Sequence, residues 1–549
     1  MRMEISQAGT EPKFFARQAT GLVREAGWLD MVLFNAVGNT TLGIGFAFAM
    51  TYVLVALVGA SLIWAQIIST IFGIFVVVTW GLLSSAIPRS GGDYVINTRV
   101  ISPFWGFVGS FGLIVANFIF SGNVAIWFTQ YMLGPAFASL GMVTHNQSLA
   151  TFGTNIAGSG ATFIIGTIFL FLTVLVCILG MRIAMRVQLI TVIIGMVAFI
   201  TTVLSLLFMD HNTFVSNFNS VAQPYTNQAN TYNYFLQQSG KNGFSLDYSR
   251  AIEFTFIAFL SIQGFVANSF WSAYVAGEIK GVRGNRRSVG MMLVPVLVTG
   301  SLLTLAFWLL LDRGGNDFVS AVNFLSGAAP STYALPAPPY SNMLAAIATN
   351  NAFLTFIIGF GILGWGVAQS IVNYLFMSRV MFAWGFDRVL PLRLAAVSDR
   401  FHTPVVALLV AFVGAELTLI VFVYFKSSQI ATFQAAVFLI GQLSLILVGA
   451  SGVIFPYLKK ELYEKSPAKL EFAGIPVMVI CGVVTTLGEI GTLLIYFFYP
   501  QLGLANFQTT SIVLAIPLVI GAAIFLVAKY IRSREGLQLA AVYQEIPPE

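Results

Sequence analysis

Small and polar residues interrupt the first long apolar stretch of the chain, where residues 34–48 read FNAVGNTTLGIGFAF. Glycine adopts backbone conformations that other residues avoid, and Asn and Thr side chains can hydrogen-bond their own backbone in place of the helical ladder. A helix broken here would present unpaired N–H groups, which attract a carboxylate, and unpaired carbonyls, which accept from an ammonium group. The residues that predict this chemistry are Gly38, Asn39, Thr40, Thr41, Gly43 and Gly45.

A second apolar stretch carries a similar interruption, at residues 259–278 with the sequence FLSIQGFVANSFWSAYVAGE. Its interrupting residues are Gly264, Asn268 and Ser269. Small and polar residues also let membrane helices pack closely, so both interpretations stay open for this stretch. If both stretches break, a small zwitterion would bind between the broken ends. Carbonyls near Gly38 and Val266 would then accept from its ammonium group, and Asn268 and Ser269 would contribute to the same site.

The Cys and His residues do not indicate metal or thiol chemistry. Cys177 and Cys481 lie far apart in apolar stretches, so they form neither a CxxC pair nor a disulfide framework. His145, His211 and His402 each stand alone in a polar connection. We therefore expect no metal site, no cofactor, no catalytic residues and no enzymatic activity.

The composition predicts that these interrupted stretches are parts of membrane-spanning helices. Of the 549 residues, 57% are hydrophobic and only 9% are charged, whereas soluble domains carry about 25% charged residues. Apolar runs of about 20 residues cross a bilayer as helices, and these runs lack the short alternation of barrel strands. We predict an all-α polytopic membrane protein with twelve spans, at residues 29–57, 61–86, 104–138, 161–181, 187–208, 251–277, 289–311, 346–377, 404–425, 429–457, 473–498 and 510–529.

The basic residues predict the orientation of these spans. With twelve spans and an internal N-terminus, all but four of the 27 Lys and Arg residues fall on the inner side. The four outer ones are Lys241, Arg250, Arg313 and Lys426. Because inner connections carry the excess of Lys and Arg, we expect both termini to be cytoplasmic and the bilayer to be the plasma membrane. The formal charge of +6 then reflects topology and not binding of nucleic acid. The first 28 residues lack the apolar segment of a cleaved leader.

Three separated motifs lie in the connections between the predicted spans. The first is IPRSGGDYVI after the second span, and the second is AGEIKGVRGNRRSVG after the sixth. The third is SRVMFAWGFDRVLP after the eighth span, followed by FHTPVVALL at the start of the ninth. These motifs resemble those of the amino acid–polyamine–organocation transporter superfamily. The matching residues are Pro88, Gly91, Gly92, Tyr94, Glu278, Lys280, Arg286, Ser378, Arg379, Asp387, Pro391, Thr403 and Pro404.

This resemblance implies a five-plus-five inverted repeat in which spans 1 and 6 are broken and hold the substrate near the midplane. The predicted regions are an N-terminal segment 1–28, a first repeat 29–208, an external polar loop 209–250, a second repeat 251–457, two further helices 458–529 and a C-terminal tail 530–549. In span 1 the family glycines correspond either to Gly43–Gly45 or to Gly38–Thr41, and in span 6 Asn268 stands where the family has a glycine.

The superfamily usually carries amino acids and related small amines, and we expect spans 1, 3, 6, 8 and 10 to line the cavity. Further candidates on these spans are Asn117, Asn123, Trp127, Phe270, Trp271, Trp365 and Gln442, although each can equally pack against a neighbouring helix. No Asp or Glu stands at the middle of these spans. We therefore expect a neutral amino acid, apolar and aromatic ones included, rather than arginine or a polyamine. The alternatives are another small amine or nucleobase-like solute, or a channel or receptor on the same fold.

Energy coupling is predicted from a few ionisable and hydroxyl residues. The superfamily's sodium site uses a Ser or Thr pair in span 8, where this chain has Ser370 alone, so coupling to protons or exchange is favoured over sodium. Glu253, near the outer start of span 6, is the candidate for coupling or gating, although a carboxylate at a helix start is also favoured by the helix dipole. Glu416 and Glu489 are expected to lie in peripheral spans, away from the substrate. The protein is expected to be a monomer or a homodimer.

Overall fold

The computed structural model describes residues 22–38, 41–265, 267–282, 284–425, 436–502 and 506–544. Three predicted site residues, Asn39, Thr40 and Val266, lie outside the described residues. Apart from one short hairpin, the described elements are helices.

The first half of the chain forms helices of very different lengths. Ser61 begins one of the long helices by accepting from Trp64 N, and that helix ends at Ala86 because Pro88 cannot continue it. In chain order the elements are α1 (Trp28–Gly38), η1 (Thr41–Gly45), α2 (Phe46–Ala56), α3 (Leu62–Ala86), α4 (Gly92–Val100), α5 (Pro103–Trp127), η2 (Phe128–Leu133), α6 (Gly134–Val143), α7 (Gln147–Ile156), α8 (Ser159–Ile178), α9 (Met181–Leu207), α10 (His211–Thr226) and α11 (Thr231–Lys241).

The second half repeats this mixture of long and short helices. Its elements are α12 (Ala251–Ile262), η3 (Gln263–Phe265), η4 (Trp271–Glu278), α13 (Asn285–Gly314), α14 (Asn316–Ala328), α15 (Pro330–Tyr333), α16 (Ser341–Thr349), α17 (Ala352–Gly361), α18 (Leu363–Phe386), η5 (Leu392–Ala395), α19 (Val405–Tyr424), α21 (Val437–Ile440), α22 (Gln442–Leu458), α23 (Lys460–Lys465), β1 (Glu471–Phe472), β2 (Ile475–Pro476), α24 (Val477–Phe498), η6 (Pro500–Leu502), α25 (Phe507–Arg534) and α26 (Leu539–Val542). The two strands pair antiparallel as a hairpin before α24.

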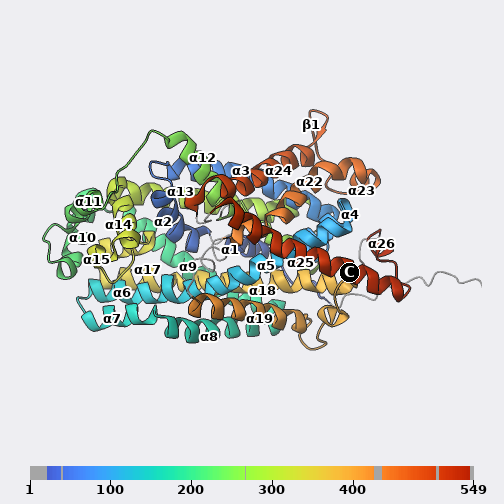
Figure 1. The fold of residues 1–549 in the computed structure, drawn as a ribbon, viewed down its shortest axis with the longest axis horizontal. Helices are drawn as coiled ribbons and strands as arrows, with labels where there is room; N and C mark the ends of the chain where they lie inside the picture. The colour runs from blue at the N-terminus through green and yellow to red at the C-terminus, as the bar shows by residue number, and fades with distance from the viewer. Residues whose placement is uncertain are drawn as a thin grey trace, which may run out of the picture.

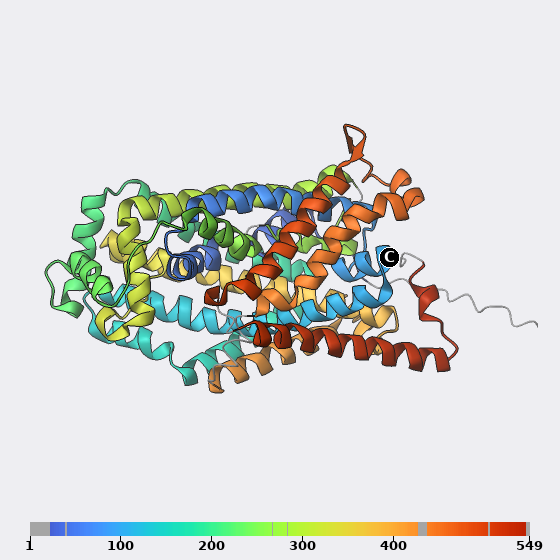
Figure 2. The same ribbon diagram turned by 45° about the horizontal axis from the view of Figure 1, so that its top comes forward.

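The long helices lie side by side and share one long axis. Figure 1 shows α10, α11, α14 and α15 at one end of this axis, which we call the α11 end. The helices α4, α23 and α26 and the hairpin lie at the other, which we call the α4 end. In Figure 2, α25 runs along the outside of the bundle towards the α4 end.

Nine of the described helical segments are long and apolar enough to cross a bilayer. They are Leu62–Ala86, Pro103–Val143, Ser159–Ile178, Met181–Leu207, Asn285–Gly314, Ala352–Phe386, Val405–Tyr424, Val477–Phe498 and Phe507–Arg534. Two shorter apolar helices are Ala251–Ile262 and Gln442–Leu458. The protein is therefore a polytopic helical membrane protein, while the count of twelve spans and the inverted repeat stay predictions.

Both apolar stretches singled out by their small residues depart from α-helical geometry. In the first, α1 ends at Gly38, and the described chain resumes as the π-helical η1, which continues into α2. In the second, α12 ends at Ile262, a 3₁₀ turn follows at η3, and the chain regains helical turns only at η4. The second stretch thus contains a break, and not only small residues that allow close packing.

Residues 209–250, predicted as a polar loop, instead contain the helices α10 and α11. Asp210 and Asn230 cap these helices by accepting from Thr213 N and Asn233 N. Phe214 and Phe218, four residues apart, are fully buried on one face of α10. The prediction was wrong because the abundance of Asn and Gln concealed an apolar stripe with helical spacing.

The eighth span, predicted at residues 346–377, has different boundaries. The chain forms the separate helix α16, turns at Asn350 with a left-handed φ of 47°, and starts again as α17. Asn351 caps α17 by accepting from Phe353 N and Leu354 N. The paired asparagines end one helix and begin the next, so the apolar run is divided among α16, α17 and α18, and the last of these reaches Phe386.

Residues of the three motifs meet at the α4 end, although more than 280 positions separate some of them. Arg379 on α18 forms a forked ion pair with Glu278 on η4, at 2.8 and 2.9 Å, and both side chains are buried. Arg99 on α4 forms a second buried forked pair with Asp387, at 2.6 and 2.8 Å. Planar guanidinium groups match carboxylates in this bidentate geometry, so the two pairs connect α4, η4 and α18.

The left-handed Gly91 and Gly92 provide the close approach that this junction needs. Gly91 has φ of 110° and donates its N–H to the carbonyl of Tyr274 at 2.9 Å. A Cβ on Gly92 would lie 2.3 Å from the Tyr274 ring, so a side chain there has no room. Pro88 ends α3 before this turn, and Pro391 caps η5 on the far side of the junction.

Removing the Glu278 charge is expected to destabilise the fold strongly. Glu278→Gln leaves the Arg379 guanidinium buried without a counter-charge, a change that costs about 3–5 kcal/mol in buried pairs. The apparent melting temperature of the purified protein in detergent should fall clearly. Glu464→Gln is the control, because Glu464 pairs with Lys469 at the exposed surface. Equal melting temperatures for the two variants would contradict a structural role for the buried pair.

Candidate functional site

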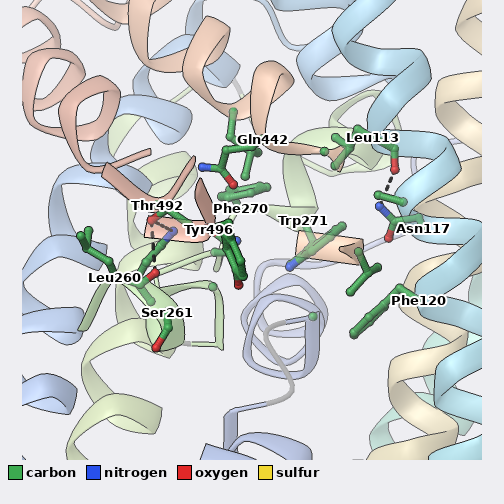
Figure 3. A pocket seen from close by; sticks show the side chains of 18 residues that line it. Leu113, Asn117, Phe120, Leu260, Ser261, Phe270, Trp271, Gln442, Thr492 and Tyr496 are labelled. Atoms are coloured by element: carbon green, nitrogen blue, oxygen red, sulfur yellow. Dashed lines mark hydrogen bonds between the residues drawn. The ribbon is translucent and has the colours of Figure 1, made fainter. Parts of the chain in front are cut away.

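A cavity of about 90 Å³ lies where the two interrupted stretches meet. Figure 3 shows Leu113, Asn117 and Phe120 of α5 on one side and Thr492 and Tyr496 of α24 on the other, with Trp271 between them. The lining residues share one property, which is the lack of formal charge. They are Gly38, Leu113, Ala116, Asn117, Phe120, Leu260, Ser261, Gln263, Gly264, Asn268, Phe270, Trp271, Val437, Gly441, Gln442, Leu445, Thr492 and Tyr496.

The buried side chain of Asn35 holds the two interrupted stretches together. Its Nδ2 donates to Ser272 Oγ at 2.9 Å and to the carbonyl of Met291 at 2.8 Å, and its Oδ1 accepts from Ser272 N at 2.8 Å. Ser269 Oγ donates to the Asn35 carbonyl at 3.4 Å. Since unpaired backbone groups are costly in the bilayer core, these bonds allow the chain to leave α-helical geometry beside the cavity.

Asn268 lines this cavity and, within the described chain, carries a buried acceptor without a partner. Its Oδ1 is buried and has no hydrogen-bond partner among the described residues. On α5, Asn117 Nδ2 donates to the Leu113 carbonyl at 2.8 Å, which fixes that side chain along the helix. A buried amide oxygen without a partner costs free energy, so a ligand that donates to Asn268 would recover that cost.

Two glutamines, Gln263 and Gln442, join the cavity wall to α24 by hydrogen bonds. Gln263 Nε2 donates to Glu489 Oε2 at 3.1 Å and to Thr492 Oγ1 at 3.3 Å. Gln442 Nε2 donates to the same carboxylate oxygen and to the Glu489 carbonyl, the latter at 3.0 Å. The two glutamines line the cavity, and the carboxylate lies directly behind them.

An aromatic cluster separates this cavity from the α4 end. It consists of Trp80, Phe270, Trp271, Tyr274 and Phe376. Trp80 stacks on Phe270 with ring centroids 4.1 Å apart, and Tyr274 meets Phe376 edge to face at 4.3 Å. Phe270 and Trp271 face the cavity, whereas Tyr274 reaches the turn at Gly91. Packed rings therefore fill the path between the cavity and the α4 end.

The segment before α1 also packs at the α4 end of this path. The N–H groups of Glu25 and Ala26 donate to the Glu278 carbonyl at 3.1 and 3.2 Å, and Lys280 N donates to the Ala26 carbonyl at 3.0 Å. Asp93 is buried beside these elements and accepts from Ser444 Oγ. Burial raises the pKa of the Asp93 carboxyl to about 6.

Several residues predicted from the sequence do meet at this cavity. They are Gly38, Asn117, Asn268, Phe270, Trp271 and Gln442. Gly38 occupies the closest approach, because a Cβ there would lie 2.1 Å from Trp271 Cδ1. Its carbonyl, predicted to accept from an ammonium group, instead receives Gln369 Nε2 at 3.4 Å. The end of α1 thus meets the cavity with bare backbone, because Gly38 has no side chain.

Other predicted residues lie outside the described cavity lining. Gly43 packs against Trp365, whose ring also fills the space beside Gly195 of α9. Ser269 is buried against Asn35, and Asn123 and Gly45 are buried elsewhere in the bundle. Thr41 begins η1. Trp127, the remaining aromatic candidate of span 3, is buried near the end of α5, where its ring packs against Phe120.

Glu253 lies at the start of α12, far along the helix from the cavity. Its Oε2 accepts from Arg250 Nε at 2.8 Å, and its Oε1 accepts from Tyr499 Oη at 2.7 Å. The side chain is 40% exposed. Gln263 on the same segment is ten residues away, roughly 15 Å at the rise of a helix. Its predicted role in coupling or gating stays a prediction.

Sequence reasoning missed Gln263, Thr492 and Tyr496 and placed Glu489 away from the substrate. The structure corrects the placement of Glu489, because α24 packs against α12 and α22 and brings its carboxylate to the glutamines of the cavity. Gln263 directly precedes Gly264, so this polar side chain at the predicted break could have identified Gln263 as a site residue. The contribution of α24 had no local signal, since only tertiary packing brings it there.

The family model described as Amino acid permease matches residues 31–525, which include every residue that lines the cavity. The chain belongs to the amino acid permease family. A search of curated proteins found no match to this permease. The family points to a membrane transporter rather than to an enzyme. Within the described part of the permease, no three His, Cys, Asp or Glu residues lie together as metal ligands would.

Adding a methyl group at Gly38 is expected to weaken substrate binding by the permease. Gly38→Ala would force Trp271 away from its position at the cavity, and overpacking of this kind costs about 1–3 kcal/mol. The concentration of amino acid needed for half-maximal uptake should therefore rise roughly tenfold. Gly160→Ala is the matched control, because a Cβ at Gly160 meets nothing within 4 Å. Unchanged uptake by Gly38→Ala would show that this close approach is unimportant.

Proposed function

We propose that this permease carries a small neutral amino acid across the plasma membrane by alternating access, with the cavity between the interrupted stretches as its binding site. The observation that carries the proposal is the uncharged lining, since none of the 18 residues around the cavity is Asp, Glu, Lys or Arg. A cationic substrate buried there would have no counter-charge among the lining residues, which is costly in a low-dielectric site. A zwitterion can instead be held by amides and backbone dipoles.

The size of the cavity favours the smaller neutral amino acids. Its volume of about 90 Å³ is small beside the roughly 300–1,000 Å³ that is typical of small-molecule sites, so a solute of the size of alanine or serine is favoured. A larger apolar or aromatic amino acid requires Trp271 or Phe120 to move. Asn268, with its unpaired Oδ1, is the proposed acceptor for the substrate's ammonium group.

The arrangement of the α4 end supports alternating access as the mechanism. The aromatic cluster and the buried ion pairs close this end, which the distribution of Lys and Arg assigns to the cytoplasm. Release on that side requires η4 and α18 to separate, and the interrupted stretches supply non-helical chain at which such a movement can occur. Proton coupling or exchange is favoured over sodium, because Ser370 shares a hydrogen bond with Thr173 and does not line the cavity.

Uptake into liposomes reconstituted with the purified permease tests the proposed substrate class. Uptake of radiolabelled alanine or serine is expected to be saturable and to be inhibited by excess unlabelled neutral amino acids. Excess arginine, spermidine or adenine should not inhibit it. Liposomes without protein give the background. A permease that responds only to polyamines or nucleobases would contradict the proposal, and a large passive ionic current would indicate a channel instead.

Removing the unpaired acceptor should weaken binding without preventing transport. Asn268→Ala deletes a hydrogen bond to the substrate worth about 1–1.5 kcal/mol, so the apparent affinity should fall roughly five- to tenfold. The measurement is the substrate concentration that half-saturates uptake. Asn233→Ala serves as the control, because Asn233 is exposed on α11 at the far end of the bundle. Equal affinities in both variants would remove Asn268 from the site.

A further inference from the structure

The carboxyl group of Glu489 occupies an unusual position behind the cavity. Its residue is 1% exposed, and its Oε2 accepts from the side-chain amides of Gln263 and Gln442. Its Oε1 has no partner among the described residues. An ionisable group inside a membrane bundle is costly, so its presence beside a binding cavity calls for a functional explanation.

No cation faces this carboxyl group from the described elements packed around it. The helices α3, α21 and α22, the turn η6 and the strand β2 contain no Asp, Glu, Lys, Arg or His. On α12 the charged group is Glu253, roughly 15 Å away along the helix. The charges of α25 lie at its last turns, at Lys529, Arg532 and Arg534. On α24 itself the other titratable residues are Cys481 and Tyr496, each roughly 10–12 Å along the axis.

The surrounding polar atoms fit two protonation states. As a carboxylate, Glu489 accepts from both glutamine amides, as the structure shows. As a carboxylic acid it must donate its proton, and Gln263 Oε1 is a buried acceptor with no partner among the described residues. Rotation of the Gln263 amide would bring that oxygen to the acid. Because Gln263 stands where the α12 helix breaks and also lines the cavity, protonation would change the wall that the substrate contacts.

We propose that Glu489 is the proton-binding residue that couples proton movement to substrate movement. The inference rests on the proposed function, namely transport of a neutral zwitterion through the adjoining cavity. One proton binds the Glu489 carboxylate while the substrate occupies the cavity, and the same proton leaves the carboxyl group after the substrate is released on the other side. Each cycle then moves one neutral zwitterion and one positive charge.

The substitution Glu489→Gln removes the titratable proton while it keeps the size of the side chain. Glutamine keeps an oxygen that can accept from both neighbouring amides, but it cannot bind or release a proton in the physiological range. Glu416→Gln is the matched control, since Glu416 also lies within an apolar helix and also has an unpaired buried oxygen, Oε2. Its other oxygen accepts from Thr167 on α8 at 2.6 Å, and it does not line the cavity.

The test compares two activities of the protein in liposomes. The first is the charge moved across the membrane when a saturating neutral amino acid is added, which reports the proton because the zwitterion carries no net charge. The second is exchange of labelled for unlabelled substrate, which needs no net proton movement. Both are measured between pH 5 and pH 8.

For wild type and Glu416→Gln, we expect substrate-dependent charge movement together with exchange. Glu489→Gln should retain exchange within about threefold, lose at least nine-tenths of the charge movement and lose the pH dependence of uptake. Charge movement at the wild-type level in Glu489→Gln would overturn the proposal, as would wild-type uptake that is independent of pH and moves no charge. If wild type neither takes up nor exchanges neutral amino acids, the proposed function fails instead.

If Glu489→Gln loses exchange as well, a second variant tests whether Glu489 binds the proton. Glu489→Asp keeps an ionisable group but withdraws it from Gln263 and Gln442 by one methylene. A shift of at least half a pH unit in the midpoint of pH-dependent uptake supports Glu489 as the proton site. A midpoint equal to that of wild type and of Glu416→Asp overturns it.

Discussion

Asn35 supplies the hydrogen bonds that allow a membrane-embedded chain to leave helical geometry next to a cavity. A helix satisfies its own backbone, and an interrupted helix does not, so the chain between α12 and η4 needs partners from elsewhere. The Asn35 carboxamide pairs with both the N–H and the hydroxyl of Ser272, and it also reaches the Met291 carbonyl on α13. One side chain on α1 thereby fixes the start of η4, and through it the positions of Phe270 and Trp271.

The aromatic cluster depends on this arrangement and on the lack of a side chain at two glycines. Trp271 approaches the backbone of Gly38, and Tyr274 approaches that of Gly92, both closer than a Cβ would allow. Rings packed against one another and against bare backbone lie between the cavity and the α4 end. Such packing is bistable rather than compressible, because interiors at this density move by displacing whole side chains. That property suits a barrier that must open and close.

The sequence was informative where the physics is local. Gly38, Asn268 and Gly264 marked the interrupted stretches, since their conformational preferences act within a few residues. Prediction failed where the decisive contacts are tertiary, as for α24, whose Thr492 and Tyr496 reach the cavity only because that helix packs against α12 and α22. It also failed where composition concealed spacing, as for the buried phenylalanines of α10. The three motifs indicated the family, but two buried ion pairs became visible only in three dimensions: Glu278 with Arg379, which joins two motifs, and the motif residue Asp387 with Arg99, which lies outside the motifs.

Placing an acid behind two amides, rather than in the cavity wall, has an electrostatic consequence. A carboxylate about 4 Å from a substrate ammonium group contributes about 4 kcal/mol at an effective dielectric constant of 20, which would favour cationic substrates over zwitterions. At about twice that distance the attraction falls by half, and the intervening amides of Gln263 and Gln442 can reorient to screen it further. The cavity wall stays uncharged, while the hydrogen bonds of its glutamines still depend on whether Glu489 carries a proton. In the proposed mechanism, selectivity for a neutral substrate and sensitivity to protons are compatible because they belong to two adjacent layers of side chains.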